Sequence, residues 1–351
     1  MIIENVLIVD PLDGEYVGSV EFEDVILDVK KSNKSTYDNI LMPAFVDPHI
    51  HGIKGIDTMT ASQEDFKKFK EFEALEGVWY FQPTTVTCPL TKLSEINLPS
   101  DLKLHIEGPF IASKRKGAHN EAYIQPPPRD VHELERYLPL SYIGMITVAP
   151  EYDTFMEFAR SCEVKGIRIS LGHSDATFEQ VKSAFENGFK RITHFPNALS
   201  PLHHRELGVT GAGLLLDFTL EIIADGIHCA PEFVNFVYKV KGAEKIILVT
   251  DSISATGLED GNYMLGDLHV KVENGIAKLS DGTLAGSTLR FSQAVKNFAK
   301  FTRCSLKELA MVSSYNACKD LNLNGGRIKE GYPAKLVLLD DGLNIKKVWN
   351  F

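Results

Sequence analysis

Residues 45–52 read FVDPHIHG, an apolar run that ends in two histidines at positions i and i+2. Four more potential metal ligands follow short apolar runs in KLHIEGPF (103–110), IRISLGHSD (167–175), RITHFPN (191–197) and KIILVTDS (245–252). A parallel (β/α) barrel carries its reactive side chains at the carboxyl ends of its strands. The placement therefore predicts a TIM-like (β/α)8 barrel with a metal site at its mouth.

Segments on either side of these motifs alternate between strand and helix patterns. Amphipathic stretches such as SQEDFKKFKEFEALEG (62–77) and FEQVKSAFENG (178–188) have apolar residues at helical spacing. Such alternation is the sequence signal of a parallel sheet, and eight strands close a barrel. The expected strands are Leu41–Val46, Val78–Thr85, Leu102–Ile106, Tyr142–Val148, Gly166–Leu171, Arg191–Thr193, Leu220–Ile223 and Ile246–Val249.

The two ends of the chain differ from its middle. Residues 1–42 and 327–351 are rich in strand-like segments and turns and lack long helical periods. We expect them to pair into one small β-sandwich domain beside a barrel made of residues 43–326. The segment HVKVENGIAKLSDGTL (269–284) predicts a hairpin that turns at Asn274-Gly275 and is inserted after the eighth strand.

Composition narrows the classes of function. The chain has 351 residues, 44% of them hydrophobic, and a formal net charge of −10. Nucleic acid and anionic membranes require a basic face, so we expect neither as a partner. The five cysteines are scattered and form no C-x-x-C pair, which favours a reducing cytoplasm over a disulfide framework. We expect no signal peptide at the start and no membrane-spanning segment.

The types of ligand restrict the metal. His49 and His51 stand at the end of an expected strand, where Pro48 helps the backbone to leave the regular pleat so that both rings can face one cation. One histidine after a strand is often structural, but the same placement at six positions is hard to explain in that way. Histidine, glutamate and aspartate without cysteine suit Zn²⁺ or Fe²⁺, and the residues leave that choice open.

Seven segments, in chain order, carry a family resemblance. The chain resembles the N-acetylglucosamine-6-phosphate deacetylases, a branch of the amidohydrolase superfamily, from Pro43 to Thr288. The resemblance implies removal of acetate from N-acetyl-D-glucosamine 6-phosphate to give D-glucosamine 6-phosphate in amino-sugar catabolism. It also implies a homodimer or homotetramer. The segments are FVDPHIHG, HIEGPFIASKRKGAHNEAY, LGHSDAT, THFPNALSPLHHRELGVTGA, ADGIH, LVTDSISATGL and LAGST.

The same resemblance implies roles for individual residues. Glu107, His173 and His194 would bind one divalent ion, and His49 and His51 would hold a second ion bridged by the glutamate, giving one or two ions per subunit. Arg205 would bind the phosphate, in its own subunit or across a dimer interface, although an ion pair with Glu206 is an alternative for it. The implied substrate-binding residues are Ala118, His119, Asn197, Ala198, Arg205, His228, Leu284, Ala285 and Gly286.

The expected mechanism follows from the chemistry of amide hydrolysis. A divalent ion lowers the pKa of water enough for attack near neutral pH. Asp251 would accept the proton of that water and pass it to the leaving amine, and His119 would stabilise the oxyanion. Alternatives exist for both side chains: Asp251 could cap a loop, and His119 could be a solvated loop residue.

Two other functions are compatible with parts of the pattern. Another metal-dependent amidohydrolase, acting on N-acyl amino acids or cyclic amides, would keep the ligands but would not need Arg205. A non-catalytic barrel that binds amino-sugar phosphates would not need Asp251. Many members of the superfamily use a modified lysine as the bridging ligand, but the fourth-strand region SYIGMITVAPE (141–151) has no lysine. This absence favours the deacetylase branch, in which Glu107 is the bridge.

Overall fold

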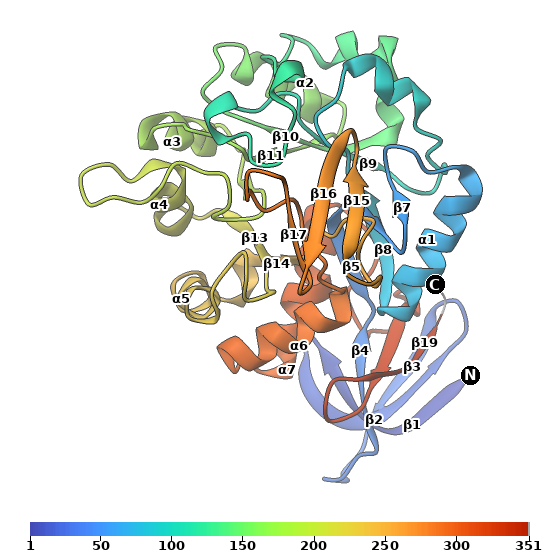
Figure 1. Cartoon of the computed structure of the whole chain (residues 1–351). Helices are drawn as coiled ribbons and strands as arrows, with labels where there is room; N and C mark the ends of the chain where they lie inside the picture. The colour runs from blue at the N-terminus through green and yellow to red at the C-terminus, as the bar shows by residue number, and fades with distance from the viewer. Residues whose placement is uncertain (350–351) are drawn as a thin grey trace.

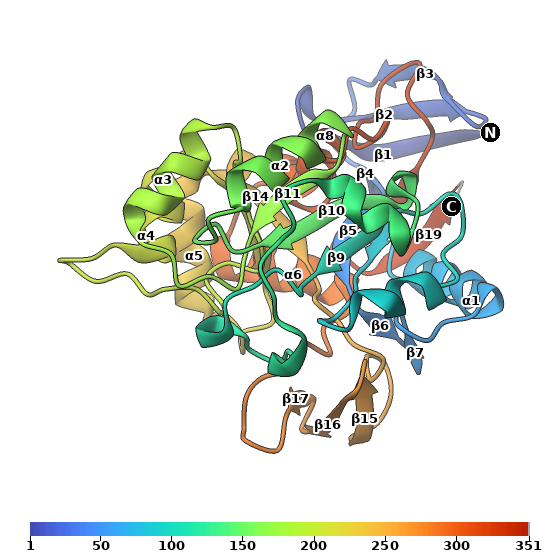
Figure 2. The ribbon, with the colours of Figure 1, turned by 90° about the horizontal axis from the view of Figure 1, so that it is seen from above.

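A ring of parallel strands lies at the centre of the computed structural model, which describes residues 1–349 (Figure 1). β9 to β14 form one six-stranded sheet in chain order, and β5 pairs in parallel with β8. Helices lie around the ring on its outer side (Figure 2). The barrel strands are β5 (Phe45–Ile50), β8 (Val78–Pro83), β9 (Leu104–Glu107), β10 (Ile143–Val148), β11 (Arg168–Leu171), β12 (Arg191–Ile192), β13 (Thr219–Ile223) and β14 (Ile246–Val249).

Backbone contacts at the strand ends join the two sheets into a closed barrel. Thr84, directly after β8, forms a parallel bridge with His105 of β9. On the opposite side, the Asp251 N–H after β14 donates to the His49 carbonyl of β5 at 2.9 Å. The predicted TIM-like (β/α)8 fold is therefore confirmed.

Some of the helices begin where the sequence supplies a side-chain cap. Ser62 and Asp65 form a capping box at the start of α1, and Thr177 and Gln180 form another at the start of α3. The crossovers from β8 to β9 and from β9 to β10 contain 3₁₀ turns, including Leu90–Glu95 and Val131–Arg136. The helices are α1 (Gln63–Leu75), α2 (Phe155–Val164), α3 (Phe178–Glu186), α4 (Gly208–Leu215), α5 (Pro231–Lys241), α6 (Phe291–Thr302), α7 (Leu306–Ala310) and α8 (Asn316–Asp320), with a π-helical turn at Met311–Tyr315.

A second six-stranded sheet joins the two ends of the chain (Figure 1). Its order is β19-β18-β4-β1-β2-β3, so strands from both ends are neighbours, and it has its own apolar cluster around Ile8, Val20 and Leu336. The expected division of the chain at residues 42–43 and 326–327 stays a prediction. The strands are β1 (Ile2–Asp10), β2 (Gly14–Phe22), β3 (Ile26–Lys31), β4 (Asn39–Pro43), β18 (Leu336–Leu339) and β19 (Ile345–Trp349).

The expected strand Leu41–Val46 is wrong, because it is two strands. β4 ends at Pro43 in the terminal sheet and β5 begins at Phe45 in the barrel. Two successive hydrogen bonds mark the switch. The Ala44 N–H donates to the carbonyl of Lys335, just before β18 of the terminal sheet, and the Phe45 N–H donates to the carbonyl of Gly77, just before β8 of the barrel. Hydrophobicity continues through both strands, so the sequence pattern contained no signal for the boundary.

The predicted hairpin after the eighth strand is confirmed and has a third strand. β15 (Gly261–Leu265), β16 (Leu268–Glu273) and β17 (Ile276–Lys278) form an antiparallel sheet, and Asn274 and Gly275 make the turn with φ of 51° and 71°. This insertion packs against Val86 and Ala118, which follow β8 and β9. A short pair, β6 (Gly52–Ile53) and β7 (Ile56–Asp57), follows β5.

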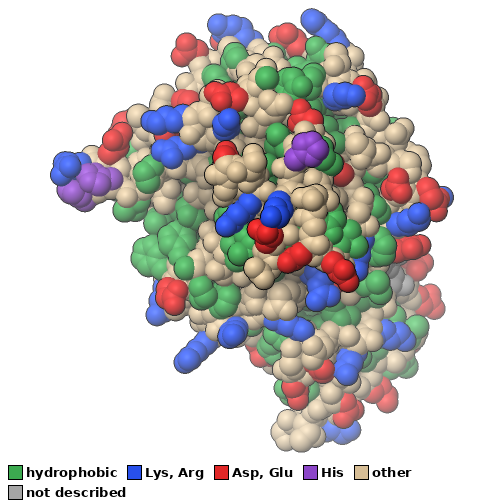
Figure 3. All heavy atoms as spheres, viewed as in Figure 1, with side chains coloured by type: hydrophobic (Ala, Val, Ile, Leu, Met, Phe, Trp, Pro, Cys, Tyr) green, Lys and Arg blue, Asp and Glu red, His purple; other side chains and the backbone are tan. Residues whose placement is uncertain are grey.

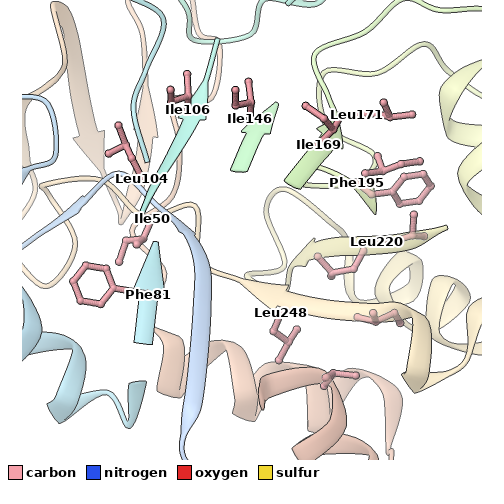
Figure 4. Packing of buried hydrophobic residues seen from close by; sticks show 14 of the residues in the cluster. Ile50, Phe81, Leu104, Ile106, Ile146, Ile169, Leu171, Phe195, Leu220 and Leu248 are labelled. Carbon is pink, nitrogen blue, oxygen red and sulfur yellow. The ribbon is translucent and has the colours of Figure 1, made fainter. Parts of the chain in front are cut away.

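The main core fills the space between the barrel strands and the helices. Figure 4 shows Ile50, Phe81, Ile106, Ile146 and Leu248 among its buried side chains, contributed by strands around the ring. Among residues 1–349, no helix has both the length and the apolar character needed to span a bilayer.

Candidate metal centre

Three of the predicted site residues occupy strained backbone positions two residues after the end of a strand. His173 follows β11 with φ of 46°, His194 follows β12 with φ of 28°, and Asp251 follows β14 with φ of 51°. The left-handed region is uncommon for residues with a Cβ, and such positions concentrate at functional sites. The strain lies where the chain leaves each strand, and all three side chains converge on the mouth of the barrel.

The six predicted ligands form two groups of three. Within each group the potential ligand atoms lie within 4.8 Å of one another, and every residue is buried. One group is Glu107, His173 and His194, and the other is His49, His51 and Asp251. The structure thus brings together every side chain that the sequence placed at the metal.

The Glu107 carboxylate lies between the two groups. Its Oε1 atom is 3.2 Å from His173 Nε2 and 3.0 Å from His194 Nε2. Its Oε2 atom is 3.2 Å from His51 Nε2 and 3.4 Å from His49 Nε2. One oxygen therefore faces each group, which is the arrangement that a bridging ligand requires.

Several atoms of the centre fit a cation better than they fit one another. The Nε2 atoms of His173 and His194 lie 2.9 Å apart, and His49 Nε2 is buried without a hydrogen-bond partner. Burial lowers the pKa of His51, but hydrogen bonds with Asp251 and Glu107 outweigh it and raise the pKa to about 9. Imidazoles and carboxylates of this kind match the donor set of a divalent transition metal.

Hydrogen bonds behind two of the histidines fix which ring nitrogen faces the centre. His173 Nδ1 donates to the Arg115 carbonyl at 2.9 Å, and His49 Nδ1 donates to Glu221 at 3.0 Å. A histidine that donates from Nδ1 keeps the lone pair of its neutral form on Nε2, the atom that faces Glu107. The supporting groups thus present both rings in the form that binds a metal.

His119 is held in the opposite tautomer. Its Nδ1 accepts from the Thr87 backbone N–H at 3.1 Å and lies 2.7 Å from Thr87 Oγ1. Burial and the neighbouring His173 lower the pKa of His119 to about 4, so the ring is neutral near pH 7. A neutral ring that accepts at Nδ1 carries its proton on Nε2, which lies 3.6 Å from Glu107 Oε2. His119 therefore presents an N–H donor at the centre.

A cavity of about 340 Å³ opens above the two groups. This volume lies within the range for sites that bind small molecules. Ala285 is buried behind the cavity wall, where its N–H donates to Ala277, and His49 lies beneath the floor. The predicted residues that line the cavity are His51, Glu107, Ala118, His119, His173, His194, Asn197, Ala198, His228, Asp251, Leu284 and Gly286.

Arg205 is the predicted substrate residue that lies apart from this cavity. It is in the exposed segment 201–206, on the long loop between β12 and α4 that projects from the barrel. Its Nη1 atom is 2.9 Å from His204 Nε2, and Figure 3 shows histidine and basic side chains at the tip of this projection. The basic side chains that line the cavity are Lys114 and Arg115, both paired with Asp175.

Sequence reasoning missed the residues that support the ligands. Glu221 and Arg191 are buried in β13 and β12, and Thr87 is buried after β8. Glu221 had a readable signal, because it is a single carboxylate within the apolar strand TLEII. Thr87 had none, since a threonine beside a strand is ordinary.

Comparisons with known proteins agree on one family. The model of the amidohydrolase family matches residues 40–351. The chain is 40% identical to the N-acetylglucosamine-6-phosphate deacetylase of Lysinibacillus sphaericus, over 86% of this chain and 82% of the relative. A crystal structure of the same enzyme from Thermotoga maritima is 52% identical, with a TM-score of 0.93 and coverage of 99% and 97%.

A substrate complex is also among the similar structures. It is a mutant of the Mycobacterium smegmatis enzyme with bound N-acetyl-D-glucosamine-6-phosphate. That protein is 25% identical to this chain, with a TM-score of 0.91 and coverage of 100% of this chain and 97% of its own. The likeness extends over both the barrel and the sheet built from the chain ends.

Proposed function

The chain belongs to the amidohydrolase family, and from this premise we propose that it hydrolyses N-acetyl-D-glucosamine 6-phosphate to D-glucosamine 6-phosphate and acetate. One observation carries the proposal: Glu107 bridges two buried groups of ligands, with Asp251 in one of them, at the floor of a cavity of about 340 Å³. This arrangement supplies a metal site, a base and room for one sugar phosphate in the same place.

Glu107, His173 and His194 would hold one divalent ion, and His49 and His51 would complete a second site with Asp251 and the other oxygen of Glu107. When bound, a divalent ion lowers the pKa of water and polarises the acetyl carbonyl. We propose Zn²⁺ or Fe²⁺, one or two ions per subunit, because the donors are imidazole and carboxylate.

Asp251 moves the proton in this reaction. Burial alone would raise the pKa of Asp251, but the neighbouring His49 and His51 lower it below its usual value, so the carboxylate is ready to accept. It takes a proton from the attacking water as the new C–O bond forms at the acetyl carbon. It then returns that proton to the sugar nitrogen as the C–N bond breaks, which leaves the free amine and acetic acid, whose remaining proton passes to solvent.

His119 stabilises the oxygen of the acetyl carbonyl as it becomes negative. Thr87 fixes the ring so that Nε2 carries the proton, and the lowered pKa keeps the ring neutral over the working pH range. A neutral N–H donor stabilises an oxyanion without first losing its proton to solvent. The alternative that His119 is a solvated loop residue is wrong, because the side chain is buried.

Residues around the upper cavity hold the sugar. Asn197, Ala198 and His228 come from the loops after β12 and β13, and Leu284 and Gly286 come from the segment opposite. Asp225 accepts from His228 Nδ1 at 2.6 Å. Burial lowers the pKa of His228, but this hydrogen bond outweighs it and raises the pKa, which favours a ring that donates to an anion.

Arg205 binds the phosphate of a substrate that lies in the cavity of a second subunit. It lies outside the cavity of its own chain, on a projecting loop. Leu215, Phe236 and Val240 of α4 and α5 are exposed near the base of this loop, and Figure 3 shows apolar side chains gathered over this face. A homodimer that buries this face brings the Arg205 guanidinium of one subunit to the cavity of the other. There it can hold the phosphate through two parallel hydrogen bonds.

The cytoplasm is the proposed location. The five cysteines are free thiols in the structure, and unpaired thiols persist in a reducing compartment.

Rates on matched substrates test the proposed function. Acetate release from N-acetylglucosamine 6-phosphate is compared with release from three other compounds. They are unphosphorylated N-acetylglucosamine, N-acetylgalactosamine 6-phosphate and an N-acetyl amino acid. We expect kcat/KM to be higher for the phosphorylated sugars than for the other two compounds by at least about 100-fold. A site whose polar groups bind the phosphate leaves those groups unpaired when the phosphate is missing. Preference for the N-acetyl amino acid would favour another amidohydrolase, and binding without turnover on any substrate would favour a sensor.

Hybrid dimers test the role of Arg205. Arg205→Ala and Asp251→Asn are each impaired alone, but a mixed dimer has one site with an intact Asp251 and the partner's intact arginine. We expect mixing to restore activity to about one quarter of the wild-type rate at random assortment. No recovery on mixing would place Arg205 in its own subunit, and Arg160→Ala, which removes an exposed arginine from α2, is the matched control.

A further inference from the structure

Glu221 is a carboxylate buried beneath the metal ligands. It belongs to β13, its side chain is fully shielded from solvent, and its neighbours in the strand are apolar. An ionised carboxylate in such a place is strongly unfavourable unless charged or hydrogen-bonding partners compensate it. Its partners therefore indicate what the residue does.

Each oxygen of Glu221 accepts two hydrogen bonds. Oε2 accepts from His49 Nδ1 at 3.0 Å and from the backbone N–H of His194 at 3.1 Å. Oε1 accepts from Arg191 Nε at 2.9 Å and from Arg191 Nη2 at 2.6 Å. Arg191 is itself paired with Asp320 at the far end of its guanidinium. Arg191 thus holds one oxygen of the Glu221 carboxylate. The other oxygen accepts from two of the metal ligands, His49 and His194.

The two bonds of Oε2 reach both groups of ligands at once. One fixes the His49 ring so that Nε2 points between Glu107 Oε2 and Asp251 Oδ1, at 3.4 Å and 3.5 Å. The other holds the backbone of His194 at its strained φ of 28°, which sets the ring 3.0 Å from Glu107 Oε1. A single oxygen therefore sets the position of one ligand in each group.

We propose that Glu221 is the positioning residue that makes the second ion possible, by holding His49 in the tautomer and orientation that bind a metal while it fastens His194 of the first group. Arg191 holds Glu221 in turn. The inference rests on the proposed metal-dependent hydrolysis, and it assigns Glu221 no contact with the substrate. Groups that support metal-binding histidines in this way typically change metal affinity by about 10- to 100-fold when they are altered.

Metal affinity of Glu221→Gln is the test, measured by competition with a chelator and by elemental analysis after dialysis. We expect the second ion to be weakened by about 10- to 100-fold and the first ion less, because Glu107 and His173 still hold it, together with a lower kcat and a KM changed less than about twofold. The visible spectrum of the Co²⁺-substituted protein should lose the contribution of the second site. Glu73→Gln, which removes another buried carboxylate, on α1, whose charged neighbours are Asp47 and Glu76, is the matched control.

Two further measurements keep the outcomes distinct. If Glu221→Gln does not fold, as judged by circular dichroism of the metal-free protein, the pair Arg191→Gln with Glu221→Gln removes both charges together and should show the same selective loss. Wild-type affinity for both ions in a folded variant would overturn the inference. Failure of the wild-type protein itself to bind metal or release acetate would instead overturn the proposed function.

Discussion

The mouth of the barrel and the sheet made from the chain ends both bury charged side chains, but their polar atoms are satisfied differently. In the sheet, Arg327 bonds both oxygens of Asp10, at 3.0 Å and 2.9 Å, and its Nη2 reaches Asp13 at 2.8 Å. At the mouth, His49 Nε2 has no hydrogen-bond partner, and two other ring nitrogens face each other at 2.9 Å. A buried cluster whose bonds are complete holds strands together, whereas one whose ligand atoms converge without partners is suited to bind a cation.

Loss of Glu107 should have the largest effect at the mouth. Glu107→Ala removes one ligand from each group, so we expect acetate release to fall by more than about 10³-fold and bound metal to fall with it. Elemental analysis and the rate are measured on the same sample. A variant that keeps both its metal and its rate would show that Glu107 is not the bridge.

His119 should have the next largest effect. His119→Gln removes the proposed donor to the oxyanion, and we expect kcat to fall by about 10²- to 10³-fold with metal content unchanged. Because the pKa of His119 is lowered to about 4, its neutral form is complete above about pH 5. Between pH 5.5 and 9, kcat of the variant should therefore depend on pH as in the wild type, at a lower value throughout. A different pH dependence in this range would contradict the assignment.

Arg327 tests the sheet side of the comparison. Arg327→Met leaves the buried Asp10 carboxylate without its counter-charge, so we expect the free energy of unfolding to fall by roughly 3 kcal/mol, measured in urea. The rate per folded molecule should stay at the wild-type value. Adding Asp10→Asn, which keeps an acceptor for the turn at Leu12 and Asp13, should recover part of the stability. A large loss of kcat in folded Arg327→Met would contradict the separation of the two regions.

Glu73 should have the smallest effect, in the direction of greater stability. Burial first, and then Asp47 and Glu76, raise the pKa of Glu73 well above 4.5. A raised folded-state pKa means that the stability from the neutral acid is complete below pH 4.5 and is lost as pH rises through the folded-state value. We expect Glu73→Gln to be more stable than wild type by roughly 1–2 kcal/mol at pH 8, with a smaller difference at pH 5. Equal melting temperatures at both values would contradict this.

The sequence predicted both the barrel and the convergence of the potential ligands at its mouth. Each ligand stands at the end of its strand or within two residues of that end, and the carboxyl ends of parallel strands meet at one face of a barrel, so the sequence alone indicates that the ligands lie close together. The family resemblance and the barrel are confirmed, whereas the roles of the individual residues and the division into two domains stay predictions. The metal and the subunit count also stay predictions.

Other features depended on tertiary contacts that no local pattern reveals. α4 contains Gly208, Gly211 and Gly213, which lower helix propensity, yet a Cβ on Gly213 would lie 2.7 Å from the Phe195 ring, so close packing requires the glycine. Glu221 is conspicuous as the one carboxylate of an apolar strand, but the direction of its side chain is not, because in a strand buried on both faces the residues that point into the barrel and away from it look alike in sequence. The position of Arg205 followed from the path of a loop, which spacing does not determine.

The most direct test of the central claim is acetate release from N-acetylglucosamine 6-phosphate by metal-stripped protein titrated with Zn²⁺ or Fe²⁺. The bridged pair of ligand groups predicts almost no activity without metal and a rate that rises with added ion until one or two equivalents per subunit are bound. A stripped protein that keeps the full rate, or one that binds the ions and never releases acetate, would contradict the account.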